Sequence, residues 1–165
     1  MVARGPAPPG GDLQLAIPSA RRELDIVVRS AVDAPLDGVS VALLSERYPP
    51  DRLRTVRDLD RVRFQGVGTQ TRYAIPVVGE NAPKELLGRL QSGDLIGHFE
   101  HARAGALTVC AYTLGGDLAS SGPWMRLRDH ADQLAVKCAP VEPDARVVIL
   151  AVPPQPRLDE YGTAR

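Results

Sequence analysis

The chain has 165 residues, of which 20 are basic and 20 are acidic, and charges of one sign do not gather in a long block. A chain of this length fits one domain with a buried core, and its charge balance offers no basic surface for nucleic acid. No apolar run reaches the roughly eighteen residues of a membrane helix. We therefore predict one domain that binds no nucleic acid and inserts into no membrane.

The two ends of the chain differ in composition from the middle. Residues 1–11 are mostly Gly, Pro and Ala, and residues 154–165 are polar and contain prolines. Such segments bury too little apolar surface to offset the entropy lost on ordering. We predict arms at 1–11 and 154–165 around a domain at 12–153. The opening "MVARGPAPPGGDL" lacks the apolar stretch of a secretory signal.

Most of the domain alternates apolar and polar residues with the period of two that indicates strands. We predict strands at 23–30 and 39–45, joined as a hairpin through the turn "DAPLDG". Residues 46–60 contain two prolines and dense opposite charges, which predicts a surface loop with room for one short helical turn.

Further strands follow towards the C-terminus. Alternation predicts them at 61–65, at 71–78, on both sides of the turn "SGD" within 84–103, and at 105–114. Residues 146–152, "RVVILAV", are apolar on both faces, which is typical of a central strand of a sandwich.

The clearest helix signal lies between the two cysteines, over residues 121–136. Ser121 suits the N-cap and Pro123 the first turn. One apolar stripe follows, made of Trp124, Leu127, Ala131 and Leu134. Seven or more short strands and a single helix predict a mainly β fold. We expect an antiparallel Greek-key β-sandwich of the immunoglobulin or transthyretin kind, with the helix inserted near the C-terminus.

Two stretches resemble a known family. "DAPLDGVSVALLS" resembles the opening of carboxypeptidase-regulatory-like and transthyretin-like domains, where a turn with proline and glycine precedes a strand of the form V-x-V-x-L. "RAGALTVCAYTL" resembles their later glycine turn before a strand. The resemblance spans residues 22–153 and implies a seven-stranded Greek-key sandwich that serves adhesion, assembly or binding without catalysis.

Two enzyme families with related sandwiches provide the alternative. Hydroxyisourate hydrolases use a first-strand His and a C-terminal Tyr-Arg-Gly-Ser, whereas this chain has "LDIVVRS" and "YGTAR". Intradiol dioxygenases bind iron through two Tyr and a His-x-His pair. The tyrosines of this chain are Tyr48, Tyr73, Tyr112 and Tyr161. Its closest histidines, His98 and His101, lack the His-x-His spacing. The resemblance therefore implies no enzyme, and a metal-dependent enzyme or binder on an intradiol-dioxygenase-like sandwich is the alternative.

Histidines are the usual metal ligands and acid–base groups. In a regular strand His98 and His101 point to opposite faces, so they cannot chelate one ion unless a bulge intervenes. His130 has polar neighbours on the predicted helix, which indicates a solvated or capping role. We predict no metal site and no cofactor, and His98 and His101 are the candidates should a metal be bound.

Other chemical motifs are missing from the sequence. Phosphate-binding loops, zinc-protease motifs and serine-hydrolase elbows do not occur, and "GVGTQ" indicates a hairpin turn. Asp58 and Asp60 are bracketed by Arg57 and Arg61, which predicts a solvated ion-pair face rather than a catalytic pair. We predict no catalytic residue.

The two cysteines, Cys110 and Cys138, lack the close spacing of a zinc or thioredoxin-type site. Cys110 lies in a buried-looking strand, where a nucleophile would be poorly reached. The favoured interpretation is a disulfide that fastens the intervening excursion to its strand, and two buried free thiols are the alternative.

We predict from these patterns a non-enzymatic structural or binding module of a bacterial extracellular or cell-surface assembly. Such a module would be secreted, periplasmic or exposed on the cell surface. Its partner would be another protein or a second copy, contacted through edge strands and the terminal arms. A cytoplasmic self-assembling subunit with reduced cysteines is the alternative.

Overall fold

The structure, a computed structural model, describes residues 21–36, 38–66, 68–113 and 134–153. Its elements are β1 (Arg21–Ser30), β2 (Val39–Leu44), the 3-10 helix η1 (Pro50–Arg52), α1 (Val56–Phe64), β3 (Thr69–Tyr73), β4 (Ile75–Pro76), the 3-10 helix η2 (Lys84–Leu86), β5 (Leu95–Arg103), β6 (Leu107–Thr113), β7 (Lys137–Val141) and β8 (Val147–Val152). The predicted arms at 1–11 and 154–165 lie outside these ranges. No helix within them is long and apolar enough to cross a membrane.

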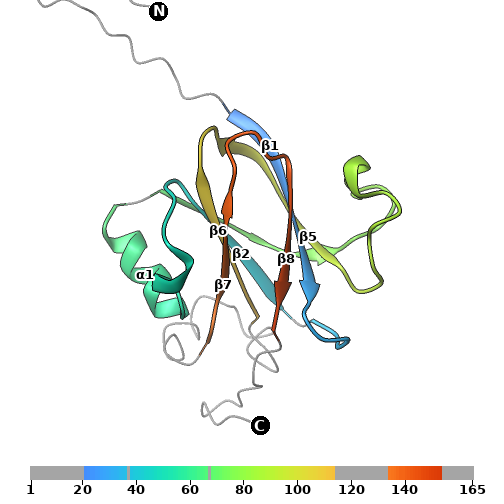
Figure 1. Ribbon diagram of the computed structural model, residues 1–165, viewed down its shortest axis with the longest axis horizontal. Helices are drawn as coiled ribbons and strands as arrows, with labels where there is room; N and C mark the ends of the chain where they lie inside the picture. The colour runs from blue at the N-terminus through green and yellow to red at the C-terminus, as the bar shows by residue number, and fades with distance from the viewer. Residues whose placement is uncertain (1–20, 37, 67, 114–133, 154–165) are drawn as a thin grey trace, which may run out of the picture.

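The strands of the described ranges form two four-stranded sheets that pack face to face (Figure 1). One sheet has the order β4-β5-β1-β8 and the other the order β3-β2-β6-β7. Neighbouring strands are antiparallel, except that β1 and β8 run parallel. The β-sandwich predicted from the sequence is confirmed, with one parallel pair that alternation could not reveal. The Greek-key order of its connections stays a prediction.

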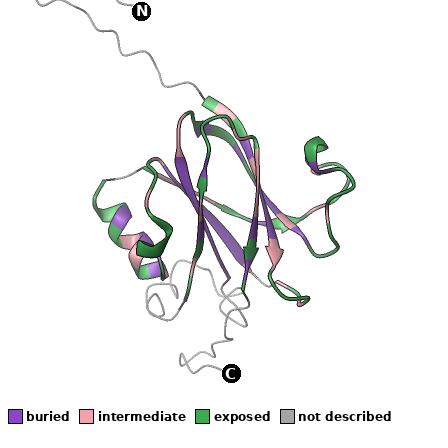
Figure 2. Cartoon of the chain, in the orientation of Figure 1, coloured by how far each residue is buried: buried purple, intermediate pink, exposed green. Residues whose placement is uncertain are grey.

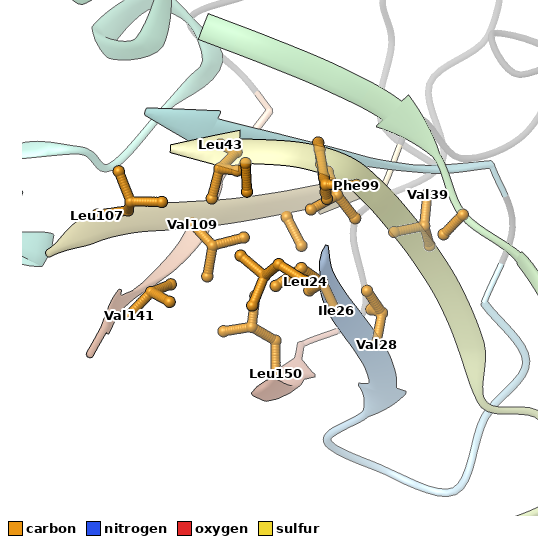
Figure 3. Packing of buried hydrophobic residues seen from close by; sticks show 14 of the residues in the cluster. Leu24, Ile26, Val28, Val39, Leu43, Phe99, Leu107, Val109, Val141 and Leu150 are labelled. Carbon is orange, nitrogen blue, oxygen red and sulfur yellow. The ribbon is translucent and has the colours of Figure 1, made fainter. Parts of the chain in front are cut away.

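The main core lies between the two sheets. Apolar side chains from both sheets point towards one another in this layer (Figure 3). They include Leu24, Ile26 and Val28 of β1, Val39, Val41 and Leu43 of β2, Phe99 of β5 and Leu150 of β8. Strands β1 and β2 therefore lie in different sheets. The predicted hairpin between them is wrong, because both bury apolar side chains in the shared core and do not pair edge to edge.

A second apolar cluster covers the outer face of the β3-β2-β6-β7 sheet. Ala42, Leu44 and Tyr112 lie on this face, and α1 packs over them through Leu59 and Val62. Figure 2 shows buried residues along α1, among exposed ones. This cover explains why every residue of β2 and β6 is buried.

Residues 46–55 contain the predicted short helical turn, η1, whereas α1 replaces the end of the loop predicted for 46–60 and the strand predicted for 61–65. The helix begins with a capping box, in which Asp58 accepts hydrogen bonds from the backbone amides of Arg54 (2.7 Å) and Thr55 (2.9 Å). Burial alone would raise the pKa of Asp58, but these hydrogen bonds and Arg61 lower it. The strand prediction failed because the alternation of Val62 with Phe64 hid a three-residue apolar spacing.

Four further predictions are wrong in detail. Residues 71–78 do not form one strand, because the chain passes from β3 in one sheet to β4 in the other. The segment before "SGD" forms η2 and turns rather than a strand. The glycine turn at "GVGTQ" joins α1 to β3 instead of closing a hairpin. Strand β8 is an edge strand, although its composition predicted a central one.

The predicted helix over 121–136 lies largely outside the described residues, as does His130. Its last three residues are extended rather than helical. The Val56 amide donates to the Leu134 carbonyl at 2.9 Å, and the Val136 amide donates to the Arg54 carbonyl at 2.9 Å. Leu134 is fully buried in the second cluster. Leu134 therefore helps to cover the outer face of the sheet, although the chain is not helical at this position.

The arginine of β1 that points into one end of the sandwich ties two turns together. The guanidinium of Arg22 donates hydrogen bonds to the carbonyls of Glu142 (2.9 Å) and Ala145 (2.9 Å) in the turn between β7 and β8. It also donates to the Gly105 carbonyl (3.0 Å) in the turn between β5 and β6. One side chain thereby donates to four carbonyl groups in these turns, since it also donates to the Pro143 carbonyl.

Cys110 and Cys138 lie directly opposite each other on β6 and β7 and form a disulfide with an S–S distance of 2.02 Å. The structure thus places the two sulfur atoms at bonding distance, as the sequence predicts. Both residues are buried in the second cluster, where the Leu53 carbonyl lies 3.7 Å from the Cys138 sulfur. The bond joins β6 to the edge strand β7.

Replacing both cysteines by alanine should lower the free energy of unfolding by about 3.5 kcal/mol, because a loop of 28 residues is no longer closed in the unfolded chain. Urea denaturation followed by circular dichroism measures the change. Protein from its native source, unfolded without reductant, should take up no thiol label. Labelling of both cysteines under these conditions would contradict the disulfide.

Candidate functional site

An open hollow of about 930 Å³ lies on the outer face of the β4-β5-β1-β8 sheet. Strands β1, β5 and β8 form its floor, the passage from β3 to β4 forms one flank, and residues 80–85 form a wall. In Figure 1 the segment that includes this wall projects to the right of the sheet. A volume of this size falls within the range of ligand sites in proteins.

The floor of the hollow follows from strand register. Asp25 of β1 lies opposite His98 of β5 and Val147 of β8, and in the next outward-facing row Val27 lies opposite Ile96. Because alternate residues of a strand share one face, these side chains all point away from the main core. The floor therefore combines one Asp–His pair with aliphatic surface.

Asp25 and His98 form a hydrogen-bonded ion pair. The Nδ1 of His98 donates a hydrogen bond to the Asp25 carboxylate. This bond raises the pKa of His98; burial opposes the rise, and the charges of Asp25, Glu23 and Glu100 support it. The imidazole is therefore held in its protonated form to higher pH than a free histidine. In that state both ring nitrogens are donors, and Nε2 is left to a ligand.

The wall of the hollow is held by a bidentate ion pair. The Nε of Arg29 lies 3.0 Å from one carboxylate oxygen of Asp94, and its Nη2 lies 2.8 Å from the other. The Asp94 side chain is 1 % exposed, and it also accepts a hydrogen bond of 2.8 Å from the Gln91 amide. Burial alone would raise the pKa of Asp94, but these hydrogen bonds and the charge of Arg29 lower it.

Apolar contacts complete the attachment of the wall. Leu86 of η2 is buried against Val27 and Ile96, and this third cluster is separate from the main core. The contact covers only one end of the outer face. Beyond it, the row of Asp25 and His98 is left open to the hollow.

Charged side chains of both signs surround the floor. Arg21, Arg146 and Lys84 line the hollow together with Glu23, Glu80 and Glu85. Within the described part of the chain, no ion pair engages any of these six side chains. Their charges are available to a ligand.

One flank of the hollow carries exposed apolar side chains. The described residues include six large hydrophobic side chains that are exposed: Val32, Phe64, Tyr73, Ile75, Val78 and Leu87. Four of these six lie on β3, on β4 or in the segment that follows β4. Tyr73 and Ile75 also line the hollow. A concentration of this kind marks an interaction surface more often than a scatter of single residues does.

The candidate metal ligands are not brought together. His98 lies in the hollow, whereas the carbonyl of His101 accepts a hydrogen bond from Gln70 and its ring lies outside the lining. The register of β1 and β5 shifts between the two histidines, so the strand contains a bulge that could have brought them to one face. The two side chains nevertheless do not line the same site, because only His98 lines the hollow. The described residues contain no group of three potential ligands for a metal ion.

The tyrosines of the iron-site alternative are spread over the molecule. Tyr73 shares the hollow with His98, while Tyr48 and Tyr112 belong to the second cluster on the other sheet. Burial raises the pKa of Tyr112 to about 12, which disfavours a phenolate ligand there. Tyr161 lies outside the described residues.

The acidic pair on α1 matches the predicted ion-pair face. Arg61 lies 3.6 Å from Asp58, and Arg63 lies 3.9 Å from Asp60. Both contacts are one helical turn apart on an exposed surface, where such pairs contribute little to stability. Asp58 caps α1, and neither Asp58 nor Asp60 lines the hollow.

Comparison of the chain with protein-family models, with curated proteins and with solved structures found no match. The residues of the hollow, rather than any relative, therefore carry the functional interpretation.

Arg29→Met should lower the free energy of unfolding by about 2–3 kcal/mol, because it leaves the buried Asp94 carboxylate without its cation. Urea denaturation measures the loss, and amide hydrogen exchange should accelerate across residues 77–94. The matched control is Arg47→Met, which breaks an ion pair of 3.0 Å whose side chains are 42 % and 65 % exposed. That change should cost less than about 1 kcal/mol. Equal losses in the two variants would show that Arg29 does not anchor the wall.

The Asp25–His98 pair should make stability depend on pH. Because the pKa of His98 is raised in the folded state, its contribution is complete below the ordinary histidine pKa of about 6.5. It should be lost as pH rises through the higher pKa of the folded state. Relative to His98→Gln, the wild-type free energy of unfolding should therefore fall from about pH 6.5 upwards. His101→Gln should keep the wild-type profile, and parallel profiles of wild type and His98→Gln would refute the assignment.

Proposed function

We propose that this protein is a non-enzymatic binding module that receives part of a partner protein in the hollow. The observation that carries the proposal is the pair of exposed apolar side chains, Tyr73 and Ile75, in the flank of a hollow with charged walls. Protein interfaces combine an apolar centre with a polar, charged rim in this way. The regular strands beneath give the surface a rigid base.

Binding accounts for the Asp25–His98 pair better than acid–base catalysis does. The described residues that line the hollow include no serine, threonine or cysteine that a His98 base could activate. An imidazole that donates through Nδ1 to Asp25 keeps its Nε2 for a ligand, which suits recognition of a polar group of a partner.

The proposed setting is extracellular or on a cell surface. The disulfide between Cys110 and Cys138 supports it, because such bonds persist in oxidising compartments. Its burial beneath the α1 cover is consistent with a structural role. The edge strand β8 supports assembly as a further contact, since its outward residues Val147 and Ile149 are aliphatic.

Photo-crosslinking tests the proposed partner surface. A benzoylphenylalanine at position 75 should give a discrete protein adduct in cells of the native source, because Ile75 is 54 % exposed on the apolar flank. The matched control is position 32, where Val32 is 50 % exposed on the connection between β1 and β2. An adduct with another protein or with a second copy of this chain, formed from position 75 alone, supports the proposal. Failure to form an adduct, or identical adducts from both positions, would refute it.

A further inference from the structure

Strand β8 has one open edge. It lies at the end of the β4-β5-β1-β8 sheet, and no described strand pairs with its other side. Its six residues, VVILAV, form an unbroken strand that contains no proline and no charged side chain. Natural proteins usually protect such an edge, because its unpaired amide and carbonyl groups bind other strands.

The other edges within the described part of the chain are protected. Each carries a proline or a charged side chain: Pro76 in the two-residue β4, Arg72 in β3, Lys137 and Pro140 in β7, and Glu100 and Arg103 in the part of β5 that extends past β4. Prolines and charges on an edge discourage the addition of a further strand. Among the described strands, β8 is therefore the edge best suited to strand addition.

The hydrogen bonds to β1 show which backbone groups of β8 are turned outwards. The amides of Asp25 and Ala31 donate to the carbonyls of Arg146 (2.8 Å) and Val152 (2.9 Å). In a parallel pair with this register, the even-numbered residues of β8 face β1. The odd-numbered residues therefore turn both their amide and their carbonyl groups to the open edge. These residues are Val147, Ile149 and Ala151.

The open edge is complementary to itself. An antiparallel pair centred on Ile149 places Ile149 opposite Ile149 of the second copy, and Val147 opposite Ala151 of the second copy. Each facing pair then exchanges two backbone hydrogen bonds, because both residues turn their amide and carbonyl groups inwards. Aliphatic side chains meet aliphatic side chains, and Arg146 lies opposite Val152 of the second copy, so no like charges face each other.

We propose that two copies of this chain pair antiparallel through β8 and join their β4-β5-β1-β8 sheets into one continuous sheet. Residues that face each other across antiparallel strands point to the same side of a sheet. The two hollows therefore open on one face of the dimer, with the aliphatic side chains of both β8 strands between them. Such a dimer offers two hollows to one partner surface, which strengthens binding through multivalency. The pairing needs no ligand in the hollow, so it goes beyond the proposed function.

Ala151→Pro tests the pairing. The proline removes an amide that bonds to the second copy, and the ladder with β1 keeps its hydrogen bonds, because the amide of residue 151 faces away from β1. The matched control, Ala151→Thr, keeps the amide at the same exposed position.

Sedimentation equilibrium of the full chain, with its disulfide intact, measures association up to millimolar concentration. Wild type and Ala151→Thr should show the same monomer–dimer equilibrium. Ala151→Pro should associate at least about tenfold more weakly, because the dimer loses two hydrogen bonds. A wild-type chain that stays monomeric, or equal association of all three proteins, would overturn the inference.

Amide hydrogen exchange of the wild-type chain tests the register without a substitution. The amides of Val148 and Leu150 face β1, so their protection should be independent of concentration. The amides of Val147, Ile149 and Ala151 should become protected only as the dimer forms. A dimer in which these three amides still exchange freely overturns the inference, even if Ala151→Pro fails to fold. Crosslinking from position 75 decides the proposed function separately, because Ile75 lies on β4 at the opposite edge of the sheet.

Discussion

The architecture depends on one constraint: β2 and β6 are buried on both faces, and β1 and β5 carry apolar residues on part of their outer face, so each sheet needs a cover as well as a partner. All residues of β2 and β6 are buried, which requires α1 and Leu134 on the far side of their sheet. In the other sheet the outward-facing side chains of Val27 and Ile96 also need to be covered. There the cover is short, because Leu86 packs only on the row of Val27 and Ile96. The hollow is the part of an outer sheet face that its cover leaves open.

The segment that forms this incomplete cover is held by an ion pair more than by buried apolar area. Few apolar side chains of the segment before β5 contact the sheet, and Arg29 and Asp94 fix it through two hydrogen bonds in a nearly dry environment. A bidentate pair of this kind fixes orientation as well as distance. The wall can therefore stand upright beside the sheet without folding flat onto it.

The sequence predicted what depends on local pattern and missed what depends on distant pairs. Alternation identified most of β1, β2 and β5, and apolar runs identified β6 and β8, because all five strands bury side chains in the same core. It could not show that Arg29 meets Asp94 or that Asp25 meets His98, since these pairs are 65 and 73 positions apart. The cysteine pairing was accessible because only two cysteines exist. Helix α1 was missed because a run of charges concealed the spacing of Val56, Leu59 and Val62, although the Thr55–Asp58 capping pattern was a usable signal.

The parallel pairing of β1 and β8 decides which side chains of β8 reach the hollow. The register places Val147 beside Asp25 and Ile149 beside Val27. Because alternate residues of a strand share one face, these two aliphatic side chains lie on the outer face together with the Asp25–His98 pair. A single parallel edge strand, which alternation could not reveal, thus sets aliphatic side chains beside a charged pair on one flat floor. Such a surface favours a partner with a complementary arrangement over one with a similar number of charges.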